Sequence, residues 1–184
     1  MDFNDHWRLE GKHAFLSPSQ YHWVNYSSEK LEERYYNSEA TKRGTELHAY
    51  AASAIKLNRR QPRSKNSDSV SMFINDAIGY SMTPEQALYY SDYCFGTADA
   101  ISFWKNKLRI HDLKTGVVPA SMMQLYVYAA LFCLEYKYDP SEIEIELRIY
   151  QSNDCVTEVP NPTDISDIMA KIVDFSAILE RLDN

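Results

Sequence analysis

The sequence predicts an α/β fold, in which a central mixed β-sheet is flanked by helices and further helices lie at the N-terminus. β-Favouring residues dominate positions 90–113, and a polar turn at 105–107 divides them into two neighbouring strands. Residues 142–150 alternate between charged and apolar side chains, which is typical of a strand with one buried face. Between these strands, residues 121–136 predict a helix that is apolar on nearly every side. A helix that crosses over between two strands favours a mixed sheet.

Helices are expected before the first strand. Residues 17–20 read Ser-Pro-Ser-Gln and predict a helix start, because the serine can cap, the proline suits the first helical position and the glutamine completes a capping box. The charged residues 27–36 predict continued helix after a break. A second long helix is expected over 38–57, with Ser38 as its cap.

Further helix signals lie on both sides of the strands. Residues 70–80 predict a short helix, and Thr-Pro-Glu-Gln at 83–86 repeats the proline-assisted capping box, which predicts another. After the last clear strand, residues 154–159 are expected to form its hairpin partner. Thr163 then caps a final amphipathic helix.

The bulk composition favours one intracellular domain. The chain has 184 residues, 45% of them apolar, so we expect a single domain over 1–184 with a mobile insertion at about 58–91. No run approaches the roughly 20 apolar residues that cross a bilayer, and the first residues do not resemble a signal peptide. The three scattered cysteines form neither a disulfide framework nor a metal knuckle. A soluble, reduced, intracellular protein is the expected class.

The net charge of −7 argues mildly against nucleic acid as a partner, because phosphate contacts dominate such affinities. A cluster of carboxylates is itself negative until a cation binds, however, and a local basic patch is enough for binding. Residues 59–65 supply such a patch, and it begins with Arg59 and Arg60. A solvated loop explains the same run equally well.

Two acids and a lysine come together in the stretch from Phe95 to Gly116, which contains the two neighbouring strands. Side chains two residues apart in a strand point to the same face, so Asp112 and Lys114 project together, and the turn brings Asp99 back alongside them. Two carboxylates and a lysine can hold a hard divalent cation and position a water. A structural ion pair between Asp112 and Lys114 would offset the cost of burial as well, and spacing alone leaves both interpretations open.

Two weaker constellations flank these residues along the chain. His48 lies four residues after Gly44 on one helix face, so a small residue leaves space beside an imidazole. Gln124 and Tyr128 share a face of the apolar helix. Taken alone, a histidine on a helix is more often a core or surface group than a ligand, and a glutamine on an apolar helix can simply bond to the backbone.

In chain order these residues resemble a known family. The matching segments are Arg43-Gly44-Thr45-x-x-His48, Gly96-Thr97-Ala98-Asp99, Asp112-Leu113-Lys114-Thr115-Gly116 and Gln124-x-x-x-Tyr128. Their order and separation are similar to those of the PD-(D/E)XK nuclease superfamily. Within it, the chain resembles the RecB-like and phage-type exonuclease branch, which is related to the CRISPR adaptation nucleases. The resemblance spans roughly residues 13–130 and implies a restriction-endonuclease-like core.

The resemblance implies roles for the residues that match. His48, Asp99 and Asp112 would ligate Mg²⁺ or Mn²⁺, together with the backbone carbonyl of Leu113. Lys114 would orient or deprotonate the attacking water and stabilise the charge that develops on the phosphate.

Other residues would complete the catalytic set and contact the substrate. The resemblance implies that Gln124 and Tyr128 brace the site and contact the DNA strand. Ser19 and Arg43 would contact phosphates. Some relatives hold an iron–sulfur cluster through four cysteines near the two ends of the chain, and three cysteines at 94, 133 and 155 cannot reproduce that arrangement, so no cluster is expected.

The resemblance therefore implies a divalent-metal-dependent deoxyribonuclease, foremost an exonuclease that serves phage-type recombination or repair. Its partners would be DNA, a single-strand annealing or recombination protein, and further copies of the chain in a homo-oligomer, with no membrane. It would act in the cytoplasm, or in the host cytoplasm if a phage encodes it. Two alternatives stay open: a non-catalytic nucleic-acid-binding or inhibitory protein that retains the nuclease fold, and a structural interaction module whose acids form ordinary ion pairs.

Overall fold

The computed structural model describes residues 14–16, 18–62 and 68–183. The chain divides into two compact units, Met1–Arg43 and Gly44–Asn184, and the boundary falls inside a long helix. The first unit contains a 3₁₀ helix, η2 (Pro18–Asn25), where the Ser-Pro-Ser-Gln signal predicts a helix start.

The long helix α1 (Ser28–Lys56) runs through residue 38, where the sequence predicts the start of a second helix. The break predicted before residues 27–36 is confirmed, because η2 ends at Asn25 and α1 begins at Ser28, whereas the separate helix start with a cap at Ser38 is wrong, because residue 38 lies inside α1. Strong helix formers fill residues 29–34, so the helix that begins at Ser28 is well established before it reaches residue 38. Ser27 caps the helix instead, since its Oγ accepts a hydrogen bond from the backbone N–H of Lys30 at 3.3 Å.

The unit Gly44–Asn184 is built on a five-stranded sheet with the order β1-β2-β3-β4-β5. Its strands are β1 (Thr83–Ser91), β2 (Cys94–Trp104), β3 (Lys107–Leu113), β4 (Glu144–Gln151) and β5 (Asp154–Glu158). β3 and β4 pair in parallel, and the other neighbours pair antiparallel. The helix α3 (Met123–Tyr136) and the short η3 (Pro140–Glu142) connect the parallel pair. The predicted α/β fold with a mixed sheet and a helical crossover is confirmed.

Residues 83–91 form the edge strand β1, so the helix predicted from the capping signal at 83–86 is wrong. Pro84 lacks a backbone N–H and is tolerated here because it lies near the start of an edge strand. Leu88 is fully buried in the main core. Pairing with β2 and burial of this side chain therefore override the local helix signal.

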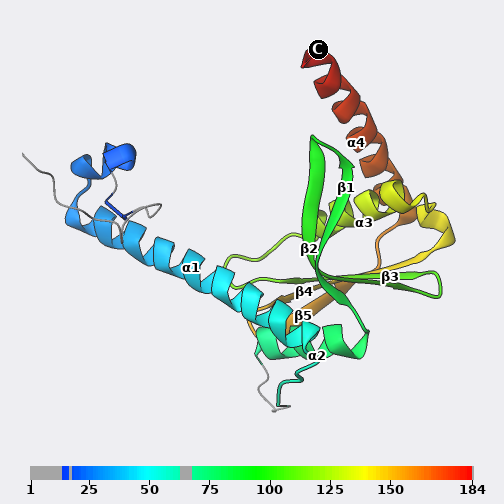
Figure 1. The fold of residues 1–184 in the computed structure, drawn as a ribbon, viewed down its shortest axis with the longest axis horizontal. Helices are drawn as coiled ribbons and strands as arrows, with labels where there is room; N and C mark the ends of the chain where they lie inside the picture. The colour runs from blue at the N-terminus through cyan, green and yellow to red at the C-terminus, as the bar shows by residue number, and fades with distance from the viewer. Residues whose placement is uncertain (1–13, 17, 63–67, 184) are drawn as a thin grey trace, which may run out of the picture. The chain divides into compact units, whose positions relative to one another are not determined.

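Helices cover both faces of the sheet (Figure 1). α3 and α4 (Pro162–Leu182) pack over one face, and α2 (Ser69–Gly79) and the C-terminal end of α1 pack over the other. Asn161 caps α4 by accepting a hydrogen bond from the Thr163 N–H at 3.0 Å, so the predicted cap at Thr163 is wrong by two residues. None of the helices in the described part of the chain combines the length and apolar character that a membrane crossing requires.

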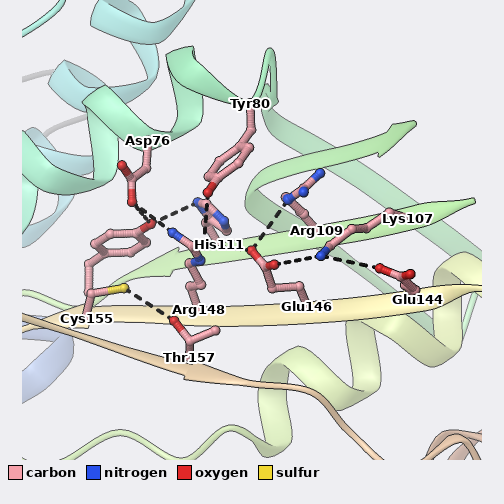
Figure 2. Close-up of polar contacts among 11 residues, drawn as sticks. Asp76, Tyr80, Lys107, Arg109, His111, Glu144, Glu146, Arg148, Cys155 and Thr157 are labelled. Atoms are coloured by element: carbon pink, nitrogen blue, oxygen red, sulfur yellow. Dashed lines mark hydrogen bonds and ion pairs between the residues drawn. The ribbon is translucent and has the colours of Figure 1, made fainter. Parts of the chain in front are cut away.

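A polar network fastens α2 to the sheet (Figure 2). Asp76 of α2 accepts hydrogen bonds from Tyr150 Oη at 2.7 Å and from Arg148 Nη1 at 3.0 Å. His111 of β3 is fully buried, and its Nδ1 lies 3.2 Å from Tyr150 Oη. The network therefore fixes the strand residue that immediately precedes Asp112.

Candidate functional site

The β2–β3 hairpin carries both of the acids that the sequence singles out. Asp99 comes one residue before the paired Ala100 and Asp112 one residue after its partner His111, so the two acids lie at the same end of the hairpin. Asp99 Oδ2 accepts a hydrogen bond from the backbone N–H of Leu113 at 2.8 Å. Leu113 is the last residue of β3 and Lys114 follows it. The hairpin thus brings Asp99 beside the strand end that carries Asp112 and Lys114.

Two side chains from other elements join Asp99. His48 of α1 places its Nδ1 3.3 Å from Asp99 Oδ1. Glu85 of β1 completes a group in which one ligand atom of each residue lies within 4.8 Å of the others. We call His48, Glu85 and Asp99 the cation cluster. Imidazole nitrogen and carboxylate oxygen suit Mn²⁺, and the carboxylates also suit Mg²⁺.

Glu85 is the member of the cluster that sequence patterns do not single out. The Thr-Pro-Glu-Gln signal assigns it to a helix start, and no spacing rule links it to His48 or Asp99. Its backbone φ of 53° lies in the left-handed region, which is uncommon for a residue with a side chain. Strained backbone of this kind concentrates at functional sites. Only the pairing of β1 with β2 reveals that Glu85 faces the cluster.

Asp112 adjoins the cation cluster without belonging to its three-residue group. Lys114 Nζ lies 3.2 Å from Asp112 Oδ1 and 3.0 Å from Oδ2. Only the contact with Oδ1 has hydrogen-bond geometry, so among the described residues the buried Oδ2 accepts no hydrogen bond. A buried carboxylate oxygen without a donor is costly, and a nearby cation would offset that cost.

The electrostatics of Asp112 also fit a cation. Burial raises the pKa of Asp112, and the negative charge of Asp99 raises it further, whereas the hydrogen bond from Lys114 lowers it. One neighbouring ammonium group therefore does not fully compensate the buried acid. An added positive charge would stabilise its ionised form.

The same acids raise the pKa of His48, which lies on α1. Its hydrogen bond with Asp99 raises the pKa of His48, desolvation opposes that effect, and the charges of Asp99, Asp112 and Glu85 add to it. The acids that favour a proton on this imidazole would also favour a metal ion. The two would therefore compete for His48.

A chain of hydrogen bonds leads from Lys114 back to β2. Lys114 Nζ donates to Gln124 Oε1 at 2.7 Å, and Gln124 Nε2 donates to Tyr128 Oη at 3.5 Å. Tyr128 Oη in turn donates to the backbone carbonyl of Thr97 at 2.6 Å. Two residues four apart on α3 thus connect the end of β3 to β2.

Two glycines leave room for these side chains. A Cβ added to Gly44 would lie 2.8 Å from Thr115 Oγ1, closer than real contacts allow. A Cβ added to Gly96 would lie 3.0 Å from the Tyr128 ring. The mid-helix glycine therefore permits a close approach to the segment after Lys114, which explains why a residue unfavourable to helices is present there.

The four residues predicted to contact DNA lie on η2, on α1 or just beyond it. Arg59 and Arg60 are exposed after the C-terminal end of α1. Arg43 is exposed on α1 in the unit Met1–Arg43. The side chain of Ser19 lies outside the described residues.

The site thus combines acids and an imidazole from four elements with an ammonium group that an amide holds in place. No family model matches this sequence, and no curated protein does either. The cation cluster has ligands suited to a divalent metal ion, and Lys114 supplies N–H donors next to it. Such a combination can stabilise a reaction in which negative charge develops on a bound phosphate.

Proposed function

We propose that this chain is a divalent-metal-dependent deoxyribonuclease, acting as an exonuclease that hydrolyses DNA phosphodiester bonds in recombination or repair. The position of Lys114 is the observation that carries the proposal. Its ammonium group bridges Asp112 and Gln124 beside the cation cluster. The order of the motifs along the chain, which resembles the PD-(D/E)XK nucleases, supports the same activity.

The residues would have separate tasks in hydrolysis. His48, Glu85 and Asp99 would hold the cation, which when bound polarises a phosphate oxygen and lowers the pKa of a coordinated water. Lys114 has three N–H donors, and its contacts with Asp112 and Gln124 use two of them. The third can donate to the attacking water or to a phosphate oxygen, where it would stabilise the charge that develops.

The direct ion pair between Asp112 and Lys114 favours a second candidate function. At 3.0 Å, it is the contact expected of a structural interaction module whose acids serve only to balance charge. The two candidates differ in their response to metal. A nuclease gains stability when Mn²⁺ binds the cation cluster, by about 2.7 kcal/mol at a metal concentration 100 times the dissociation constant. A structural module shows no such gain.

The deciding experiment incubates the full chain with linear and closed circular DNA in Mg²⁺, in Mn²⁺ and in EDTA. Linear DNA should be degraded with either metal, and both EDTA and Lys114→Ala should abolish the reaction. Lys171→Ala, at an exposed lysine of α4, serves as the matched control and should keep full activity. Degradation that persists in EDTA or in Lys114→Ala contradicts the proposal, and cutting of closed circles makes the enzyme an endonuclease.

Thermal unfolding gives a second test that does not depend on the substrate. Mn²⁺ should raise the melting temperature of the wild type and should not raise that of Asp99→Asn. Asp92→Asn, at an acid that bonds only the Tyr89 hydroxyl among the contacts described, should respond like the wild type. An equal response of wild type and Asp99→Asn would favour the structural module.

A further inference from the structure

The C-terminal half of α4 carries large apolar side chains that are exposed in the part of the chain that the structure describes. They recur at helical spacing and share one face, which we call the α4 stripe. The α4 stripe consists of Phe175, Ile178, Leu179 and Leu182, and their exposed fractions range from 41% to 75%. We propose that the α4 stripe binds the same stripe on a second copy of the chain, with the two helices antiparallel. The inference does not depend on the proposed nuclease activity.

The core of the unit uses only the first part of α4. Ile165 and Ile172 are buried. Ile168 and Met169 are partly buried and pack against the main core. Ser176 is the last buried residue of α4, and Figure 1 shows that the remaining turns extend past α3. The α4 stripe therefore adds little to the packing of the unit, and a contiguous apolar face of this kind marks an interaction surface.

The β1–β2 hairpin occupies one flank of the α4 stripe. Ser176 Oγ lies 3.0 Å from Ser91 Oγ, and both serines are buried. The hydroxyl of Tyr93 donates a hydrogen bond to Asp183, which caps the end of the helix. The hairpin therefore leaves the opposite flank open to a partner.

The open flank carries two charges of opposite sign. Asp174 and Arg181 are both exposed and lie seven residues apart, so they occupy equivalent positions beside the apolar face in successive heptads. When two identical helices pack antiparallel about a two-fold axis, the same flank of each helix meets. Asp174 of one copy then lies opposite Arg181 of the second copy, and the symmetry repeats the pair. The surface is thus complementary to itself in charge.

The antiparallel arrangement also interleaves the apolar side chains. With Asp174 opposite Arg181, the two-fold axis passes between residues 177 and 178. At a rise of about 1.5 Å per residue, Phe175 of one copy lies between Leu182 and Leu179 of the second copy. A parallel pair would instead place Asp174 against the flank that the hairpin occupies. Only the antiparallel pair therefore satisfies both the charges and the apolar face.

The contact is short, so the dimer should be weak. Residues 174–182 span about 12 Å of helix. Interfaces of this size belong to the transient class, and we expect a dissociation constant in the micromolar range. Because both copies use the same surface, the contact is closed at two copies and does not extend into a filament.

The charge of α4 argues against a lipid surface as the occupant. Helices that lie on membranes carry Lys and Arg on the polar face. In α4, acidic residues outnumber basic ones by four to two. This excess of acids opposes binding to anionic lipids and leaves the second copy as the favoured partner.

The first test is sedimentation of the full chain over a range of protein concentrations, which should show a monomer–dimer equilibrium. Leu182→Gln should weaken the dimer by about tenfold or more, because the interface loses a buried apolar side chain. Leu57→Gln, at a leucine 60% exposed just after α1, is the matched control and should leave the equilibrium unchanged. A wild type that stays monomeric at about 0.1 mM, or equal effects of the two substitutions, overturns the inference.

The second test exchanges the charges. Asp174→Arg and Arg181→Asp should each weaken the dimer by about three- to tenfold at low salt, because each places like charges opposite one another. A mixture of these two variants should form a heterodimer about as stable as the wild-type dimer, since every charge then meets its opposite. Asp167→Arg, the same change one heptad earlier on α4, should not weaken the dimer. If the mixture associates no better than either variant alone, the antiparallel pairing is wrong.

Two controls separate dimerisation from other roles of the α4 stripe. Thermal unfolding by circular dichroism should give similar melting temperatures for the wild type and Leu182→Gln at a concentration where both are monomeric, because the side chain is exposed in one copy. Neutral phosphatidylcholine vesicles should not bind the wild type. Vesicle binding that Leu182→Gln abolishes, without a dimer in solution, would show that the stripe lies on lipid and would overturn the inference.

Discussion

Lys114 Nζ lies 2.7 Å from Gln124 Oε1, so a residue of α3 fixes the ammonium group that follows strand β3. Gln124→Ala removes this partner and leaves Lys114 free to adopt other rotamers. We expect kcat to fall about 10- to 100-fold with little change in KM, because the interaction positions a group that acts on the transition state.

Tyr128→Phe offers a graded comparison for the same contact chain. It removes the hydroxyl that donates to Thr97 and keeps the ring beside Gly96, so its effect should be smaller, about two- to fivefold in kcat. Tyr136→Phe, at an exposed tyrosine at the end of the same helix, should have no effect.

If Gln124→Ala keeps the wild-type kcat, the position of Lys114 does not depend on the Gln124 amide. Steady-state kinetics on linear DNA provide the measurement.

The contact between Gly44 and Thr115 predicts that the effect of Gly44→Ala on the free energy of unfolding changes sign when Thr115 is replaced by alanine. In the wild type, the new methyl group of Gly44→Ala would meet Thr115 Oγ1 at 2.8 Å, and we expect the free energy of unfolding to fall by about 1 kcal/mol. In a Thr115→Ala background the nearest remaining atom, the Cβ, is 3.9 Å away. There the same substitution should raise the free energy of unfolding by up to about 1 kcal/mol, which is the helix preference of alanine over glycine. Urea unfolding of the four variants measures the coupling, and additive effects would contradict the close approach.

The left-handed backbone of Glu85 predicts that glycine at this position is more stabilising than alanine, which is the reverse of the usual order in a strand. A residue with a side chain pays about 1–2 kcal/mol in the left-handed region, and glycine does not. Glu85→Gly should therefore have a free energy of unfolding about 1 kcal/mol higher than that of Glu85→Ala. At Thr157, on the other edge strand, the usual order should hold: Thr157→Ala should have a higher free energy of unfolding than Thr157→Gly. The same order at both positions would show that Glu85 is not strained. Both Glu85 variants should also lose part of the stabilisation by Mn²⁺.

The buried His111 predicts a loss of stability in mild acid. Burial, followed by the charge of Arg148, lowers the pKa of His111 to about 3, and of its other charged neighbours Glu146 raises that pKa and Arg109 lowers it. The unfolded chain binds the proton at a higher pH than the folded one, so the stability is full above about pH 6.5 and is lost as the pH falls toward 3. His111 should contribute a loss of about 2 kcal/mol between pH 6.5 and pH 4.5.

His48 changes the free energy of unfolding in the opposite direction, and it does so at higher pH. Its pKa is raised, so its contribution is present below about pH 6.5 and is lost as the pH rises through the folded pKa. Below pH 6.5 this histidine is protonated in the folded and in the unfolded chain, so it does not change the free energy of unfolding with pH there. The raised pKa of Asp112 acts in stronger acid, where it increases the free energy of unfolding as the pH falls. Comparing wild type with His111→Gln by urea unfolding isolates the slope, and His22→Gln is the exposed control. Equal slopes in wild type and His111→Gln would contradict the prediction.

Local rules in the sequence are enough to predict one half of the site. The period of two in a strand places Asp112 beside Lys114, and the helical spacing of four places Gln124 beside Tyr128. The turn at 105–107 pairs β2 with β3 and so brings Asp99 close. The crossover helix fixes the parallel pair β3–β4. Each of these relationships joins residues that are near in the chain or repeat with a regular period.

The other half depends on contacts between distant segments. Glu85 belongs to the cation cluster only because residues 83–91 become an edge strand, and a local helix signal opposes that outcome. Burial of Leu88 and pairing with β2 decide it, and neither can be read from a window of a few residues. His48 of α1 lies 3.3 Å from Asp99, and Gly44 of the same helix lets Thr115 approach closely, so both contacts join segments that are distant in the chain. The sequence by itself therefore determined strands β2 to β5, the crossover and the acid–lysine pair. The tertiary structure decided that residues 83–91 form a strand and which acid completes the cluster, because side-chain packing between elements outweighs the local preference of any one segment.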